Sequence, residues 1–150
     1  MPVRFECVTT LAMPPDKAFD LSLSVAVHLA SMARLRERVV GGIRSDSMGL
    51  GDEITWRTRQ FGVPWQLTSK ITAFDRPRRF VDEQVRGPFN RFHHEHFFES
   101  VGSGCRMTDV VEYEARGGLV GRVAERLLLA SYVRKLIYRR NGYIAAQAGL

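Results

Sequence analysis

Residues 86–99 read RGPFNRFHHEHFFE, and this stretch decides how the rest of the chain is interpreted. Gly87 and Pro88 mark a turn, and the aromatic run after them predicts a β-strand. Side chains alternate between the two faces of a strand. One face therefore carries two imidazoles between two aromatic rings: Phe92, His94, His96 and Phe98. The other segments are interpreted by asking what this face contacts.

Further strands are expected on both sides of this stretch. Alternating apolar and polar residues, divided by Gly and Asp clusters, predict strands at 3–11, 37–43, 52–61, 64–74, 80–86, 89–101 and 105–115. From the second strand onward the connections have hairpin length, which requires antiparallel neighbours. The pattern therefore predicts a meander, with the first strand as a seventh member of the same sheet.

Helical spacing occurs at two places in the chain. A helix of about two turns is expected to begin near Pro15, and a second short helix follows at 25–33. After Gly117 and Gly118, apolar residues recur every three or four positions, which predicts a long amphipathic helix. About 25 residues of helix span ~37 Å, enough to cross a small sheet. The predicted fold class is α+β, a curved seven-stranded antiparallel sheet wrapped around the C-terminal helix.

Length and composition indicate a globular chain. We expect one domain over residues 1–150, because 45% hydrophobic and 25% charged residues are ordinary values for such a domain. No window approaches ~18 uncharged apolar residues, and the first ten residues carry charge where a signal peptide is apolar. A cytoplasmic protein without integral membrane association is expected. Cys7 and Cys105 lack CxxC spacing and are expected to be buried thiols, although a pairing between them stays open.

The net charge of +6 raises the question of nucleic-acid binding. The positive charges are mostly arginines spread along the chain, often beside Asp or Glu. The one dense cluster, Arg134, Lys135, Arg139 and Arg140, falls on the predicted C-terminal helix and is interpreted as its solvated face. Since nucleic-acid binding requires a basic patch or stripe, no nucleic-acid partner is expected.

Four local stretches resemble a known superfamily. They are GLGDEITWR at 49–57, PWQLTSKI at 64–71, RPRRFVDEQVRGPFNRFHHEHFFE at 76–99 and MTDVVEYEA at 107–115. They are similar to the SRPBCC superfamily of START-like and birch-pollen-allergen-like proteins, and within it to the cyclase/dehydrase-like group. The resemblance implies a helix-grip fold with a deep cavity between the sheet and the long helix. It also implies binding or transport of lipids, sterols, quinones or hormones, or cyclisation or dehydration of polyketides.

His94, His96 and Asp109 are the candidate reactive residues. Asp109 lies on the next antiparallel strand, where alternation places it on the same face as Met107 and Tyr113. Three interpretations stay open. In the first, the network only satisfies buried polar groups. In the second, the imidazoles hydrogen-bond a ligand, and in the third, a histidine made more basic by Asp109 transfers protons.

The same alternation selects a wall for a small-molecule pocket. Its members are mostly aromatic or apolar, as in the usual ligand pocket, and small residues on the helix would leave room for a ligand. The predicted ligand-binding residues are Trp56, Trp65, Leu67, Phe80, Gln84, Phe92, His94, His96, Met107, Asp109, Tyr113, Leu127, Ala130 and Ser131. For the two tryptophans, an ordinary core position is the alternative.

No metal and no cofactor are expected. Two histidines at i and i+2 on a strand can bind one zinc, but a third ligand is needed, and only Asp109 or a cysteine from another strand is available. Asp82 and Glu83 point to opposite faces and are not expected to act together as acid and base. His28 has no partner at ligand spacing and is expected at the surface or between helices.

These observations predict a non-catalytic protein that encloses a hydrophobic or aromatic small molecule, such as a lipid, quinone or polyketide. The alternative is a polyketide cyclase or dehydratase that uses His94 or His96 with Asp109. A regulatory module using the Arg-rich helix face has no motif to support it. Several apolar helix residues lie off the core stripe and are compatible with a sheet-edge cap, a homodimer or a membrane contact: Leu128, Leu129, Tyr132 and Leu136.

Overall fold

The computed structural model describes residues 2–42, 45–60, 62–116 and 123–149, with side chains described at 2–42, 45–60, 62–116 and 128–148. The predicted strands and helices appear in the predicted order, with the strands and short helices within about two residues of their predicted bounds, and the described residues also include two 3-10 helices. They are β1 (Val3–Leu11), α1 (Pro15–Ser22), α2 (Val25–Ser31), the 3-10 helix η1 (Ala33–Leu35), β2 (Arg38–Gly42), β3 (Glu53–Gln60), β4 (Val63–Asp75), β5 (Arg79–Arg86), β6 (Phe89–Val101), β7 (Gly104–Ala115), α3 (Val123–Ala146) and η3 (Gln147–Gly149). Expectations for residues 43, 61 and 117–122 lie outside the described residues.

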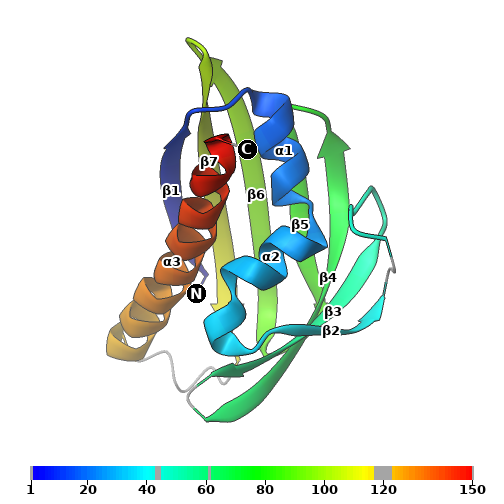
Figure 1. Ribbon diagram of the computed structural model, residues 1–150. Helices are drawn as coiled ribbons and strands as arrows, with labels where there is room; N and C mark the ends of the chain where they lie inside the picture. The colour runs from blue at the N-terminus through cyan, green and yellow to red at the C-terminus, as the bar shows by residue number, and fades with distance from the viewer. Residues whose placement is uncertain (1, 43–44, 61, 117–122, 150) are drawn as a thin grey trace.

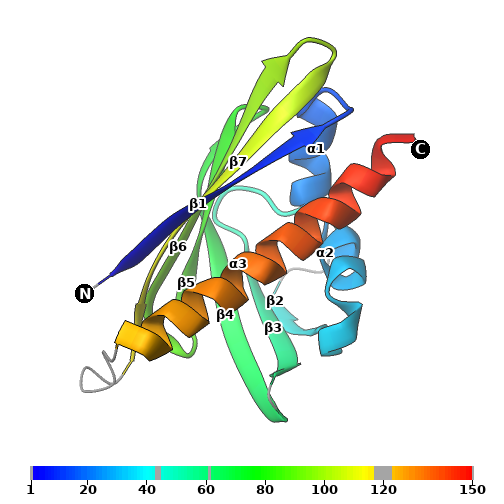
Figure 2. The ribbon, with the colours of Figure 1, turned by 90° about the vertical axis from the view of Figure 1, so that its left-hand side faces the viewer.

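The strands form one antiparallel seven-stranded sheet in the order β1-β7-β6-β5-β4-β3-β2. The predicted fold class is thus confirmed. Because β1 pairs with β7 at one edge and β2 with β3 at the other, α1 and α2 connect opposite edges of the sheet. Figures 1 and 2 together show α1, α2 and α3 on the same side of the curved sheet. None of the described helices is long and apolar enough to cross a membrane.

Two apolar clusters hold the helices against the sheet. In the first, α1 inserts Phe19 among aromatic rings of β5 and β6, with ring centroids 5.4 Å from Phe80 and 5.3 Å from Phe98. In the second, α3 packs on β1 and β7, where Phe5, Cys7, Val111, Tyr113, Val133 and Ile137 meet. Both cysteines are free and buried, and burial raises the pKa of each thiol. A cavity lies between the sheet and the helices, and members of both clusters, such as Phe80 and Ile137, line it.

The C-terminal helix differs from expectation at one charged residue. Arg134, Lys135 and Arg139 are not buried, and the Arg134 guanidinium lies 4.9 Å from the centre of the Phe5 ring. Arg140, however, is buried, with 7% of its surface exposed. The prediction that it belongs to the solvated face is wrong because Arg140 follows Ile137 by three residues and lies on the core stripe.

Candidate functional site

A cavity of about 580 Å³ lies between the sheet and the helices. Its wall includes residues from all three α-helices and from β3, β4, β5, β6 and β7, and most of it is aromatic or aliphatic. A cavity of this size is typical of small-molecule sites, which combine an apolar lining with a few placed polar groups. The placement of those polar groups therefore decides what the cavity can bind.

The structure places eight of the predicted wall residues on the cavity: Trp56, Trp65, Leu67, Phe80, Gln84, Phe92, His94 and His96. Three other predicted residues, Met107, Asp109 and Tyr113 on β7, are buried but do not line it. The reason is that side chains of α3 pack against those of β1 and β7, and Arg140 and Asn141 of α3 cover Asp109.

The helical part of the wall also differs from the prediction. Ala130 packs against the second apolar cluster, and Ser131 is exposed to solvent, so neither lines the cavity. The side chain of Leu127 lies outside the described residues. The helix instead contributes larger residues, Leu129, Tyr132, Val133, Leu136 and Ile137. Leu129, Tyr132 and Leu136, for which the sequence allowed a sheet-edge cap, a homodimer or a membrane contact, thus line the cavity. Leu128, with 71% of its surface exposed, faces away from it.

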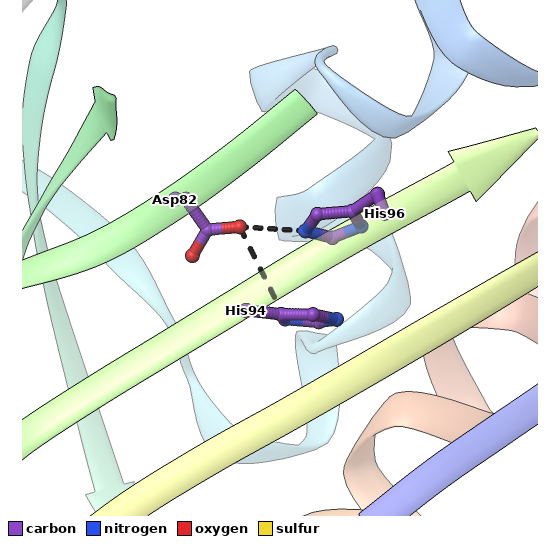
Figure 3. A group of neighbouring side chains, drawn as sticks. All are labelled: Asp82, His94 and His96. Atoms are coloured by element: carbon purple, nitrogen blue, oxygen red, sulfur yellow. Dashed lines mark hydrogen bonds and ion pairs between the residues drawn. The ribbon is translucent and has the colours of Figure 1, made fainter. Parts of the chain in front are cut away.

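A cluster of polar side chains from three neighbouring strands interrupts the apolar wall. Strand register places Asp82 of β5 opposite His94 of β6, and His96 of β6 opposite Asp109 of β7. The Nε2 atom of His94 lies 2.7 Å from Asp109 Oδ1. The Nε2 atom of His96 lies 2.6 Å from Asp82 Oδ2, and Figure 3 shows Asp82 facing both imidazoles. The imidazoles stack with ring centroids 3.8 Å apart, and the Phe80 ring stacks on His96 at 4.0 Å.

Helix α3 holds Asp109 from the other side. Arg140 Nη2 and Asn141 Nδ2 each donate a hydrogen bond of 2.7 Å to its carboxylate, and Asn141 also donates to Thr9 Oγ1 at 3.0 Å. Asp109 has none of its surface exposed. The carboxylate thus connects α3, β1 and β6, and it positions His94 from behind the cavity wall.

Sequence reasoning brought His94, His96 and Asp109 together but missed Asp82, Arg140 and Asn141. A signal existed for each. Asp82 lies between two predicted wall residues, Phe80 and Gln84, and strand alternation places it on their face. Arg140 and Asn141 follow Ile137 by three and four residues, so the helical period places both on the core stripe. The charge of Arg140 by itself favours a solvent-exposed position, which hides this signal.

The carboxylates of the cluster are stabilised in their charged forms. Burial opposes ionisation of Asp109, but the Arg140 charge and the hydrogen bonds from His94 and His96 hold its pKa well below the usual value. Burial likewise acts against ionisation of Asp82, yet the hydrogen bond from His96 and the charges of both histidines and Arg140 lower its pKa. Burial lowers the pKa of His94, aided by repulsion from His96 and opposed by the two carboxylates. His94 is therefore neutral at pH 7.

A neutral His94 presents an acceptor to the cavity. Its Nε2–H donates to Asp109, so Nδ1 carries the lone pair. This atom lies 4.0 Å from Asp82 Oδ2 and has no hydrogen bond within the described part of the chain. The Oδ1 atom of Asp82 also lacks one there, and a quarter of that side chain is exposed. The cluster thus offers two hydrogen-bond acceptors to a bound molecule.

Asp82, His94 and His96 are the one group among the described residues whose side-chain atoms lie close enough together to hold a metal ion. One atom each from Asp82, His94 and His96 falls within 4.8 Å of the others. However, the imidazole planes are only 23° from parallel, so their in-plane lone pairs do not converge on a common point. The 2.6 Å contact between His96 and Asp82 is also shorter than the roughly 3.3 Å separating ligands around a tetrahedral zinc. This geometry favours hydrogen bonding over metal coordination.

A third histidine lines the same cavity. His28 of α2 lies against Trp56 of β3, with ring centroids 4.3 Å apart and ring planes tilted by 37°. Its Nε2 atom lies 2.7 Å from Glu37 Oε1. The sequence predicts His28 at the surface or between helices and does not predict its contacts with Trp56 and Glu37. No periodic pattern links these residues, because a turn of 3-10 helix separates His28 from Glu37.

The neutral state of His94 has a consequence for stability. In the unfolded chain a histidine takes up a proton near pH 6.5, whereas folded His94 resists charging. The unfolded state therefore binds more protons as pH falls through this value, and stability decreases. We expect His94→Gln, which keeps a side-chain donor but does not titrate, to show a smaller loss of unfolding free energy between about pH 7 and pH 5.

Urea unfolding at several pH values measures this difference. His93→Gln serves as the control, because His93 lies on the opposite face of β6 and outside the cavity wall. Parallel pH dependence of His94→Gln and the unmodified protein would contradict the neutral state of His94.

Comparisons with known proteins agree with this fold. The family described as "Polyketide cyclase / dehydrase and lipid transport" matches residues 2–149. A search of curated proteins found no match. Among solved structures, Zhui aromatase/cyclase from Streptomyces sp. R1128 is similar with a TM-score of 0.78 and 14% identity, covering 99% of this chain and 94% of that one. TTHA0849 from Thermus thermophilus has a TM-score of 0.71 and 20% identity, with coverage of 97% and 98%. Norcoclaurine synthase from Thalictrum flavum has a TM-score of 0.70 and 12% identity, with coverage of 99% and 94%.

Proposed function

The chain belongs to the polyketide cyclase, dehydrase and lipid transport family, and from this premise we propose that it binds a hydrophobic or aromatic small molecule in its cavity. The ligand is oriented by its hydroxyl group. The apolar wall receives the body of the ligand, and the hydroxyl reaches Asp82 and His94. A lipid, a quinol or a polyketide carries both parts.

One observation carries the proposal: a cavity of about 580 Å³ with a mostly apolar wall contains a polar cluster that offers acceptors to a ligand. Arg140 and Asn141 donate to Asp109 behind the wall, and Arg140 itself also lines the cavity. Asp82 Oδ1 and His94 Nδ1 are the atoms left for the ligand. Because a site built to hydrogen-bond a hydroxyl discriminates strongly against analogues without one, these atoms determine specificity.

Native mass spectrometry of the purified protein, followed by organic extraction, tests this proposal. We expect a stoichiometric apolar compound to co-purify, and we expect Leu136→Trp to abolish its retention by filling the cavity. Leu128→Trp is the matched control, because it adds the same side chain to the exposed side of the same helix. An empty unmodified protein that also binds no apolar hydroxylated probe would contradict the proposal.

A second candidate function is acid–base catalysis on the bound molecule. The supporting observation is the Asp109–His94 pair, in which a buried carboxylate orients an imidazole whose other nitrogen is an unprotonated acceptor. This is the arrangement expected of a general base. Two proteins of similar structure carry enzyme names, an aromatase/cyclase and a norcoclaurine synthase, so the fold itself is compatible with catalysis.

A further inference from the structure

The His28–Glu37 pair forms a second polar site on the cavity, separate from the cluster around His94. Helix α2 supplies His28, and the segment between η1 and β2 supplies Glu37. Both line the cavity together with Trp56, whose indole Nε1 donates to Ser69 Oγ at 3.3 Å. The two sites therefore contact one ligand-sized space through different walls.

Glu37 is the residue that makes this pair a recognition site. Only 5% of its side chain is exposed, yet it lines the cavity. Its Oε1 atom is held by His28 at 2.7 Å, whereas Oε2 has no hydrogen bond within the described residues. Every buried side-chain oxygen or nitrogen atom of those residues has a partner, so Oε2 retains contact with open space. A carboxylate oxygen left without a partner in a nearly closed wall is costly unless a ligand or water pairs with it.

The two sites share one chemical pattern. In each, a histidine binds one oxygen of a carboxylate, and the other oxygen remains available: Asp82 Oδ1 in the first, Glu37 Oε2 in the second. In each, an aromatic ring lies against the histidine: Phe80 stacks on His96, and Trp56 contacts His28 with the ring planes tilted by 37°. Carboxylate oxygens only accept hydrogen bonds when ionised. Both sites therefore favour a ligand that places a hydrogen-bond donor beside an aromatic ring.

From this pattern we propose that the cavity holds its ligand at two points, with Glu37 accepting a hydrogen bond from a second hydroxyl group. The inference rests on the proposed binding function and specifies its ligand class: an aromatic molecule with hydroxyl groups at two separated positions. A ligand carboxylate at Glu37 faces a like charge, so acids are disfavoured at the second site. At the first site the charge of Asp82 is offset by Arg140, which also lines the cavity.

Paired ligands and paired variants test the proposal. The probes are diols on naphthalene, biphenyl and stilbene frames with one hydroxyl on each ring, together with their dimethyl ethers, which keep the shape and lose both donors. Affinities are measured by fluorescence titration or calorimetry on the full chain. The variants are Glu37→Gln, His28→Phe and Asp82→Asn, and Glu83→Gln is the control because Glu83 lies outside the cavity wall. Thermal unfolding confirms that each variant is folded.

For the diol that binds best, we expect Glu37→Gln and Asp82→Asn each to weaken binding by about 10- to 100-fold, the range for a hydrogen bond to a charged group. His28→Phe keeps a ring against Trp56 and is expected to weaken binding through misplacement of Glu37. Dimethyl ethers should bind weakly and respond to none of these variants.

The outcomes separate this inference from the proposed function. Diol binding that depends on Asp82 but not on Glu37 or His28 would overturn the second site and leave the proposed function intact. Equal affinity for diol and dimethyl ether would overturn recognition of a donor at both sites. If no aromatic probe binds the unmodified protein, the inference fails, whereas the proposed function fails only if no apolar compound co-purifies and no apolar hydroxylated probe binds.

Discussion

Asp109→Ala is expected to destabilise the fold by about 3–5 kcal/mol, because removing one partner of a buried ion pair leaves the other charge uncompensated. The orphaned group is Arg140, which is buried and donates to Asp109 at 2.7 Å. Asn141 and His94 lose an acceptor at the same time. Urea unfolding followed by fluorescence of the two tryptophans measures the change.

A surface ion pair on the same strand provides the control. Glu112 of β7 pairs with Arg91 where both side chains are partly exposed, and Glu112→Ala is expected to cost at most about 1 kcal/mol. A loss of less than about 1 kcal/mol for Asp109→Ala would contradict the view that this carboxylate fastens α3 to the sheet.

The difference in unfolding free energy between the unmodified protein and Asp109→Ala should decrease as the pH falls. The folded pKa of Asp109 is depressed, since the Arg140 charge and the histidine hydrogen bonds outweigh burial. The stabilisation is therefore fully present above the unfolded pKa of about 3.9 and is lost as pH falls through the folded value. The two unfolding free energies are expected to converge only in strongly acidic solution.

The strands show how far periodicity alone reaches. Alternation on β6 assigned His94 and His96 to the buried face correctly, because a strand with one covered face admits a single register. Pairing with β7 then brought Asp109 beside them. The same rule places Asp82 on this face. Asp82 escapes notice when it is considered only as a partner of Glu83, which lies on the opposite face.

The helix shows where periodicity is insufficient. Residues 127–129 are three consecutive leucines, so composition does not fix which side of α3 faces the sheet. Packing on β1 and β7 fixes it, turning Leu129 and Leu136 toward the cavity and Leu128 toward solvent. The His28–Glu37 pair has no sequence signal at all, because its geometry comes from a short turn and from the contact of His28 with Trp56 on another element.

Whether the cluster catalyses proton transfer is decided by His94. In the second candidate function, its Nδ1 atom removes a proton beside a carbonyl of the bound molecule, while Asp109 stabilises the imidazolium that forms. Hydrogen–deuterium exchange at the methyl group of a bound aryl methyl ketone, followed by NMR, reports this step without knowledge of the natural substrate. We expect the unmodified protein to accelerate exchange and His94→Gln to lose about 10²- to 10⁴-fold of that rate.

Affinity for the ketone distinguishes a base from a ligand contact. Glutamine retains a polar group at position 94, so the dissociation constant of the ketone should change by less than about tenfold while the exchange rate collapses. His93→Gln, on the opposite face of β6, should leave both quantities unchanged. Exchange no faster than in buffer, with the ketone bound, would remove the catalytic role of His94. Because Asp82 Oδ1 and His94 Nδ1 would still accept hydrogen bonds from a ligand hydroxyl, that result assigns the cluster to recognition alone.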